Sequence, residues 1–274
     1  MPPAVPWRPD RIEVAPPAIP WHAVRMNRTV LEHTSRVYET ELRELRAHIL
    51  AMGARGERIV RIAFEGFVKR TSDVVHEVAV LDAQIDRDDF EIRALILRML
   101  ALRQPVAGDL RFLATALRLV TDLERVGDEA VNIAERALER DGESGDPVGD
   151  QLGLMANATL DMLHLSLDAF VQGDAEQAAC VLVGDDEVDG HCASIIAAMT
   201  TYISAHSAEA SAGLRVIRVA KYLERIADHA TNLAEEVIFM VCADDVRHGR
   251  WQPSGSVRAT GAPSHRLAVV SGGR

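Results

Sequence analysis

Apolar residues recur at alternating steps of four and three in two stretches of the chain, with polar residues between them. The first series is Phe112, Ala116, Leu119, Leu123, Val126, Ala130, Ile133 and Ala137, and the second is Val216, Val219, Leu223, Ile226, Ala230, Leu233 and Val237. This spacing puts the apolar side chains on one face of a helix and predicts helices that pack in bundles. The sequence has no sustained two-residue alternation and no Asn-Gly turn, so strands are not predicted.

Six helical stretches are predicted, three on each side of a turn rich in glycine and aspartate. They cover residues 27–70, 73–102, 109–139, 148–171, 174–205 and 211–241. Gly53 and Gly56 mark a weak point or a break in the first stretch, and Asp109 is a predicted N-cap of the third. Helices of about thirty residues with short connections predict up-down packing.

The second half of the chain repeats the first. At an offset of 100 positions the same residue type recurs for Arg118, Leu123, Glu124, Arg125, Asp128, Ala130, Asn132, Ala134 and Glu135. Upstream, Asp82 and Asp86 match Asp185 and Asp189 at an offset of 103. The sequence therefore predicts an all-α protein made of two tandem, sequence-related three-helix bundles.

The repeat divides the chain into five predicted segments. These are a proline-rich disordered extension (1–25), the first repeat (26–140), a linker (141–147), the second repeat (148–242) and a disordered tail (243–274).

Each predicted repeat carries two pairs of carboxylates at i, i+4 spacing, which places both members of a pair on one helix flank. The first repeat has Asp82, Asp86, Glu124 and Asp128, and the second has Asp185, Asp189, Glu224 and Asp228. If antiparallel helices bring the pairs together, the carboxylates repel one another unless a cation is present. Oxygen ligands of this kind suit Mg, Mn, Ca or ferric iron, and Asn132, Asn232 and His229 could add neutral ligands. A solvated acidic face with arginine partners is the alternative, and the duplication of the motif favours a cation site.

Composition narrows the function classes. A formal net charge of −11 argues against a nucleic-acid binder. Cys180, Cys192 and Cys242 form no CxxC pair, so we expect reduced and mostly buried thiols. No stretch is apolar enough to span a membrane and no secretory signal is visible, so a cytoplasmic protein is expected.

No catalytic motif stands out. Glu-x-x-His, which ferritin-like di-iron sites need, is absent, and Asp73-x-x-His76 and Asp161-x-x-His164 are isolated and interpreted as ordinary surface histidines. P-loop, G-x-G-x-x-G and G-x-S-x-G patterns are also absent, so we expect no enzyme.

The two signatures resemble those of the PhoU family. They are Leu123-Glu-Arg-Val-Gly-Asp-Glu-Ala-Val-Asn-Ile-Ala-Glu135 and Leu223-Glu-Arg-Ile-Ala-Asp-His-Ala-Thr-Asn-Leu-Ala-Glu235. Gln104-Pro105-Val-Ala-Gly-Asp-Leu-Arg111 is similar to that family's connection between helices, and Ala227 replaces Gly127 in the second copy.

The resemblance implies two symmetric three-helix bundles in a protein that restrains phosphate uptake and the phosphate-starvation response. It implies as partners the phosphate ABC transporter with its ATPase, and the sensor histidine kinase of the phosphate system. It also implies iron or zinc clusters at the eight carboxylates named above, in some family members. We further expect a homodimer, with no nucleic acid bound and membrane association only through partners.

Three function classes remain open at this point. The first is a regulatory adaptor whose acidic faces dock a basic surface of the kinase or the ATPase. The second is a carboxylate-bundle protein that binds or stores metal, and the third is a structural helical scaffold.

Overall fold

The structure is a computed structural model of the 274-residue chain, and it describes residues 32–139 and 148–243. The predicted extension (1–25), the predicted linker (141–147) and the predicted tail apart from Ala243 lie outside these ranges. The chain divides into two units, with the boundary between Thr40 and Glu41. The described part of the first unit is the start of one helix, where the Thr40 hydroxyl donates to the Arg36 carbonyl over 2.9 Å. All that follows concerns the second unit.

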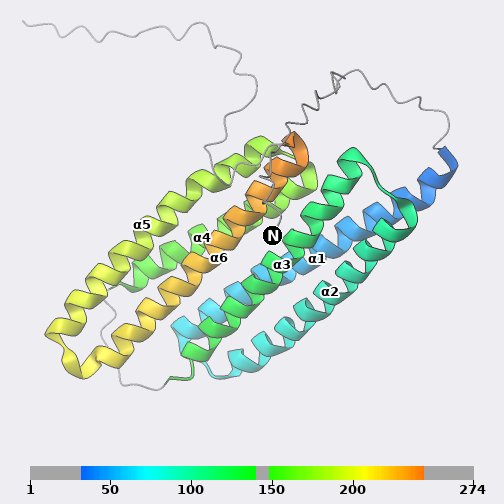
Figure 1. Cartoon of the computed structure of the whole chain (residues 1–274). Helices are drawn as coiled ribbons and strands as arrows, with labels where there is room; N and C mark the ends of the chain where they lie inside the picture. Colours follow the sequence, from blue (N-terminus) through cyan, green and yellow to red (C-terminus); the bar gives the residue numbers. More distant parts are fainter. Residues whose placement is uncertain (1–31, 140–147, 244–274) are drawn as a thin grey trace, which may run out of the picture. The chain divides into compact units, whose positions relative to one another are not determined.

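Six α-helices and a single short 3-10 turn make up the described part of the chain, and it contains no strand (Figure 1). The helices are α1 (Glu32–Lys69), α2 (Asp73–Arg103), α3 (Ala107–Arg136), α4 (Gly149–Gln172), α5 (Ala175–Ala205) and α6 (Ala210–Cys242), with the 3-10 turn η2 at Ser207–Glu209. In Figure 1, α1, α2 and α3 form one group and α4, α5 and α6 form the other. The prediction of two three-helix bundles is confirmed.

Each bundle has its core along the seam predicted for its third helix. Leu123 and Val126 of α3 and Leu223 and Ile226 of α6 are fully buried. All other members of the two series are buried too, except the outermost positions Ala137 and Val216, which are half-buried. Because burial of these side chains is the main stabilising term, the seam dictates how each third helix is oriented.

The two repeats meet along α3 and α6, which run antiparallel. The hydrogen bonds between them include Arg111 to Met240, Thr115 to Glu236, and His229 to Asp122. Residue numbers on α6 therefore decrease along the contact as those on α3 increase. A second line of contact joins α1 to α4, where Glu57 bonds His164 over 3.0 Å. The duplicated helices are thus related by an approximate two-fold rotation.

The predicted break in α1 is wrong, since the helix runs continuously through Gly53 and Gly56. Both glycines are buried, and a Cβ atom at Gly53 would lie 2.7 Å from Cδ2 of Leu167 on α4. Glycine is used here for close approach of two helices, and the tertiary contact outweighs its low helix propensity.

The predicted N-cap at Asp109 is also wrong. The α3 helix begins at Ala107, Val106 is its N-cap, and Asp109 lies in the first turn. Pro105 disfavours helical backbone at Gln104, which ends α2 in the left-handed conformation at φ 47°. In the second repeat, by contrast, Asp174 caps α5 by accepting from the N–H groups of Glu176 and Gln177.

Candidate functional site

The first acidic cluster lies where α2 and α3 face each other. Asp82, Glu124 and Asp128 are half-buried and Asp86 is exposed. Burial raises the pKa of Asp82 above its ordinary value, and the charges of Asp86 and Asp128 raise it further. Burial also raises the pKa of Glu124, with Asp128 as the next cause. The structure therefore brings together the two carboxylate pairs that the sequence placed on separate helices.

Close packing of the two helices explains this proximity. Ile85 of α2 and Val126 of α3 are fully buried beside the acidic positions. A Cβ atom at Gly127 would lie 3.1 Å from Oδ1 of Asp82. The glycine thus leaves room for the Asp82 carboxylate, whereas the second repeat has Ala227 at the matching position.

Two arginines lie next to the first cluster. Arg125 donates to Asp128 over 3.0 Å and lies 3.4 Å from Glu124. Arg93 of α2 donates to Asp89 over 2.7 Å and to the Thr121 hydroxyl over 2.9 Å. The bond to Asp89 raises the pKa of Arg93, and the charge of Glu124 raises it further. These cations balance part of the negative charge of the cluster.

The second acidic cluster repeats the arrangement between α5 and α6. Asp185 and Glu224 are half-buried, and Asp189 and Asp228 are exposed. Burial raises the pKa of Asp185, followed by the charges of Asp189 and Asp228. Partial loss of water raises the pKa of Asp228, followed by the charges of Glu224 and Asp189.

Different neighbours surround the second cluster. Lys221 donates to both oxygens of Glu224, over 2.8 and 2.6 Å. Cys192, which is buried, takes the place that Asp89 has in the first repeat, and burial raises the pKa of its thiol. Arg225, the counterpart of Arg125, reaches instead across to Glu129 of α3, over 3.4 Å.

The donor chemistry of both clusters fits a hard or borderline cation, since every member is a carboxylate. In residues 32–139 and 148–243, however, no group of three or more His, Cys, Asp or Glu side chains is arranged to hold a metal ion. Arg125 and Lys221 each hold carboxylates of the clusters. A metal ion bound there would compete with these cations for the carboxylates.

The neutral side chains suggested as extra ligands lie elsewhere. His229 and Asn232 both bond the Asp122 carboxylate on α3, over 2.9 and 3.3 Å. Asn132 donates to Glu129 over 3.2 Å. His229 and Asn232 therefore belong to the contact between the repeats, whereas Asn132 bonds within α3.

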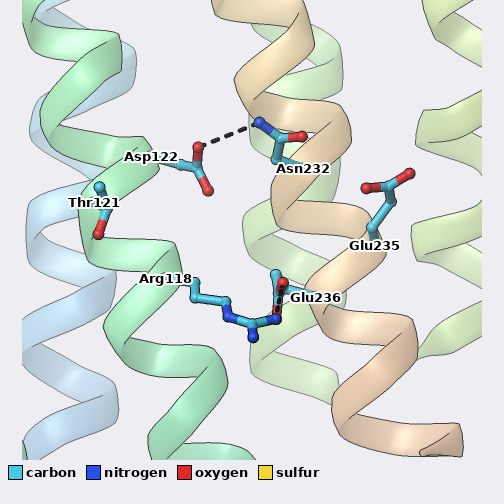
Figure 2. A pocket seen from close by; sticks show the side chains of 6 residues that line it. All are labelled: Arg118, Thr121, Asp122, Asn232, Glu235 and Glu236. Atoms are coloured by element: carbon cyan, nitrogen blue, oxygen red, sulfur yellow. Dashed lines mark hydrogen bonds and ion pairs between the residues drawn. The ribbon is translucent and has the colours of Figure 1, made fainter. Parts of the chain in front are cut away.

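Sequence reasoning missed a polar groove between α3 and α6. Figure 2 shows Arg118 and Asp122 of α3 facing Glu236 and Asn232 of α6 across it. Arg118 donates to Glu236, which is buried, over 2.6 Å. The groove has a volume of about 270 Å³ and is also lined by Thr121 and Glu235. Arg118 recurs as Arg218, but its partner Glu236 matches Arg136, so the repeat pattern alone gave no signal for this pair.

The remaining residues that the sequence analysis considered are three cysteines and two histidines. Cys192 is buried as expected, but Cys180 and Cys242 are exposed, so the expectation of mostly buried thiols is wrong. His164 is exposed on α4, and its pKa is raised by its hydrogen bond to Glu57. His76 is exposed on α2. No helix in the described ranges is long and apolar enough to cross a membrane.

Known proteins share this duplicated architecture. The PhoU domain family matches residues 49–137 and again residues 152–237. The phosphate-specific transport system accessory protein PhoU homolog of Pseudomonas putida is 35% identical over 246 residues, covering 89% of this chain and 96% of the relative. The Escherichia coli protein of the same description, PhoU, is 30% identical over 217 residues, covering 79% of this chain and 90% of its own. The chain belongs to the PhoU family.

Solved structures agree with the fold. The crystal structure of PhoU from Pseudomonas aeruginosa superimposes with a TM-score of 0.73 at 34% identity, covering 76% of this chain and 100% of that one. The phosphate transport system regulatory protein PhoU from Streptococcus pneumoniae has the same fold, with a TM-score of 0.69 at 23% identity. It covers 76% of this chain and 99% of its own.

Proposed function

We propose that this protein is a cytoplasmic, non-enzymatic negative regulator of phosphate uptake and of the phosphate-starvation response. The observation that carries the proposal is the presence of two PhoU domains in one chain that is 35% identical to a phosphate transport accessory protein homolog over 89% of its length. A role in regulating phosphate transport follows most directly from that relationship.

In the proposed mechanism the chain is an adaptor between the phosphate ABC transporter, through its ATPase, and the sensor histidine kinase. The two acidic clusters lie on helices with buried cores, so their carboxylates are presented at defined positions. At high phosphate they dock a basic surface on either partner, hold the kinase in its phosphatase-like state and damp transport. Charge complementarity then sets partner choice and association rate.

A metal at the clusters is a second part of the proposal. The eight carboxylates Asp82, Asp86, Glu124, Asp128, Asp185, Asp189, Glu224 and Asp228 would hold iron, zinc, or another divalent cation such as Mg or Mn. Burial and then repulsion between carboxylates raise the pKa values of Asp82 and Asp185, and a bound cation would relieve the repulsion by supplying positive charge. It would thereby also change the charge that a partner meets.

The test is a phosphate-repressed reporter, such as secreted alkaline phosphatase, in the host with this gene deleted and phosphate plentiful. We expect high reporter activity that returns to baseline on complementation. Complementation with a chain carrying Glu124→Ala, Asp128→Ala, Glu224→Ala and Asp228→Ala should fail, although circular dichroism shows an intact helical fold. A chain with Glu44→Ala, an exposed carboxylate outside the clusters, is the matched control and should complement.

The two other function classes predict different outcomes. An unchanged reporter together with tight metal binding by the purified protein would replace the proposal with a metal-storage function, which the all-carboxylate clusters also fit. A structural scaffold predicts that the quadruple alanine variant complements fully.

A further inference from the structure

The two ends of the contact between α3 and α6 differ in charge. At one end Arg118 of α3 donates to Glu236 of α6 over 2.6 Å, as Figure 2 shows. The two-fold rotation that relates the repeats puts Arg218 of α6 in the place of Arg118 at the other end. It puts Arg136 of α3 in the place of Glu236. The second end therefore has two arginines at the positions that form an ion pair at the first.

A third arginine lies at the second end. Arg215 of α6 precedes Arg218 by three residues and is 6% exposed, and Thr115 is its match in the first repeat. The Thr115 hydroxyl donates to the backbone carbonyl of Glu236, and Arg215 likewise donates to the backbone carbonyl of Glu139. Because a hydroxyl suffices for this contact at the first end, the duplicated fold does not itself require a guanidinium there.

Arg136, Arg215 and Arg218 form an arginine set around Glu139. Nη1 of Arg136 lies 2.5 Å from Oε1 of Glu139, and Nη1 of Arg218 lies 3.8 Å from the same oxygen. Glu135 holds Nη2 of Arg136 over 3.0 Å. Nε of Arg136 is buried and donates to no acceptor in the part of the chain that the structure describes. One carboxylate oxygen thus serves two guanidinium groups, and a buried donor is left over.

We propose that the arginine set is a binding site for inorganic phosphate, which Glu139 occupies when phosphate is absent. Guanidinium groups are planar, stay charged and pair phosphate oxygens through two N–H groups at once. A carboxylate offers two oxygens to these donors, whereas a phosphate ion offers four. Phosphate therefore satisfies more of the donors than Glu139 does, and a buried donor gains most from a partner.

The scaffold allows Glu139 to leave while the arginines stay. Arg136 is the last residue of α3, and Arg215 and Arg218 lie in α6, so packed helices hold all three. Glu139 lies beyond the end of α3, and its backbone carbonyl can keep Arg215 when the carboxylate turns away. The arginine set and Glu135 then have a net charge of two positive units, which matches the charge of hydrogen phosphate.

The choice of phosphate among oxyanions rests on the proposed function, in which the chain responds to the phosphate level. Arg136 comes from the first repeat, whereas Arg215 and Arg218 come from the second. Bound phosphate therefore joins the two repeats, so the phosphate level acts directly on the contact between them. None of the eight cluster carboxylates belongs to this site.

Isothermal titration calorimetry of the purified full chain with inorganic phosphate, at low ionic strength, tests the proposal. We expect a dissociation constant on the order of 1 mM, because Glu139 competes for the arginines. Glu139→Ala removes the competitor and should bind phosphate about tenfold more tightly. Arg218→Gln removes an exposed member of the arginine set and should bind about tenfold more weakly.

Two variants control for the change of charge. Arg61→Gln removes an exposed arginine of α1 and Glu44→Ala removes an exposed carboxylate of the same helix, and both should bind phosphate as the wild type does. Circular dichroism of each variant checks that the helices remain folded. The gain expected for Glu139→Ala also cannot result from misfolding, which would only weaken binding.

The outcomes separate this site from the proposed function. A wild-type chain that binds no phosphate up to about 20 mM overturns the site. It is also overturned by a Glu139→Ala chain that binds no more tightly than the wild type, or by Arg61→Gln weakening binding as much as Arg218→Gln. These measurements involve no partner, so their failure leaves the regulator proposal standing. An unchanged reporter in the deletion strain removes the proposed function and leaves the binding result standing.

Discussion

The two repeats have the same core and the same four-carboxylate pattern, but different cations face the two clusters. In the first repeat Arg125 contacts Asp128 and Glu124, and Arg93 lies close enough for Glu124 to affect it. In the second repeat Lys221 holds Glu224, and Arg225 turns away to Glu129 on the other repeat. Ile196 stands where the first repeat has Arg93.

This difference shows that the two repeats share one helical scaffold but differ in the positive charges that lie next to their acidic clusters. Arg125 in the first repeat contacts carboxylates of its own cluster, whereas its counterpart Arg225 contacts Glu129 of the other repeat. The second cluster is therefore left with fewer positive neighbours. We expect it to attract a cation more strongly and to lose more stability from its own repulsion.

The largest expected effect tests the part that the repeats share. Leu123→Ala and Leu223→Ala remove matching, fully buried side chains. Each should lower the free energy of unfolding by about 2–4 kcal/mol, because a large-to-small change in a packed core loses transfer energy and leaves a cavity. Urea unfolding followed by circular dichroism measures both. If the losses of unfolding free energy in the two variants differ by more than about 2 kcal/mol, the two cores are not equivalent.

A smaller effect concerns metal affinity. A chain with Asp82→Asn and Asp128→Asn keeps only the second cluster, and one with Asp185→Asn and Asp228→Asn keeps only the first. We expect Mn²⁺ to bind the chain that keeps the second cluster about tenfold more tightly, about 1.4 kcal/mol, than the chain that keeps the first cluster. Fewer cations compete for the carboxylates of the second cluster. Isothermal titration calorimetry measures the difference. Equal affinities, or tighter binding by the first cluster, would show that neighbouring cations do not control the sites.

The smallest effect is the pH dependence of Asp185. A carboxyl group whose pKa is raised in the folded state stabilises the protein below its unfolded pKa, and this contribution is lost as the pH rises through the folded value. With metal chelated, Asp185→Asn should therefore raise the free energy of unfolding at pH 7 by about 0.5 kcal/mol, after allowance for solvent screening. The gain should shrink as the pH falls toward 4.

Unfolding curves at several pH values test this expectation, with Glu44→Gln as the matched control. Glu44 is an exposed carboxylate on α1, so neutralising it should change stability little at any pH. A destabilised Asp185→Asn chain at pH 7 would mean that its carboxylate makes favourable contacts that outweigh the repulsion.

Most of the fold could be predicted from periodicity. Burial of an apolar face dominates helix packing, so the seam through Leu123 and its copy through Leu223 located the third helix of each bundle. The predicted break at Gly53 failed for a physical reason. Propensity describes an isolated helix, whereas the contact of Gly53 with Leu167 exists only after α1 and α4 meet.

The candidate site could be predicted only in part. The i, i+4 spacing placed carboxylates such as Asp82 and Asp86 on one flank, and the structure brings α2 and α3 together so that Asp82 also senses Asp128. The roles suggested for His229 and Asn232 followed from their position near Asp228 along one helix. Both residues instead bond Asp122 on α3, and the spacing of residues along α6 gives no information about such a contact with another helix.

The sequence by itself determined the helical repeat, its two-fold duplication and the carboxylate pairs, because these depend on the 3.6-residue period of a single helix. Only the tertiary structure decided which cation faces which carboxylate and where the repeats bond through Arg118 and Glu236. Those features depend on distances between segments far apart in the chain, and such distances arise only when the cores pack.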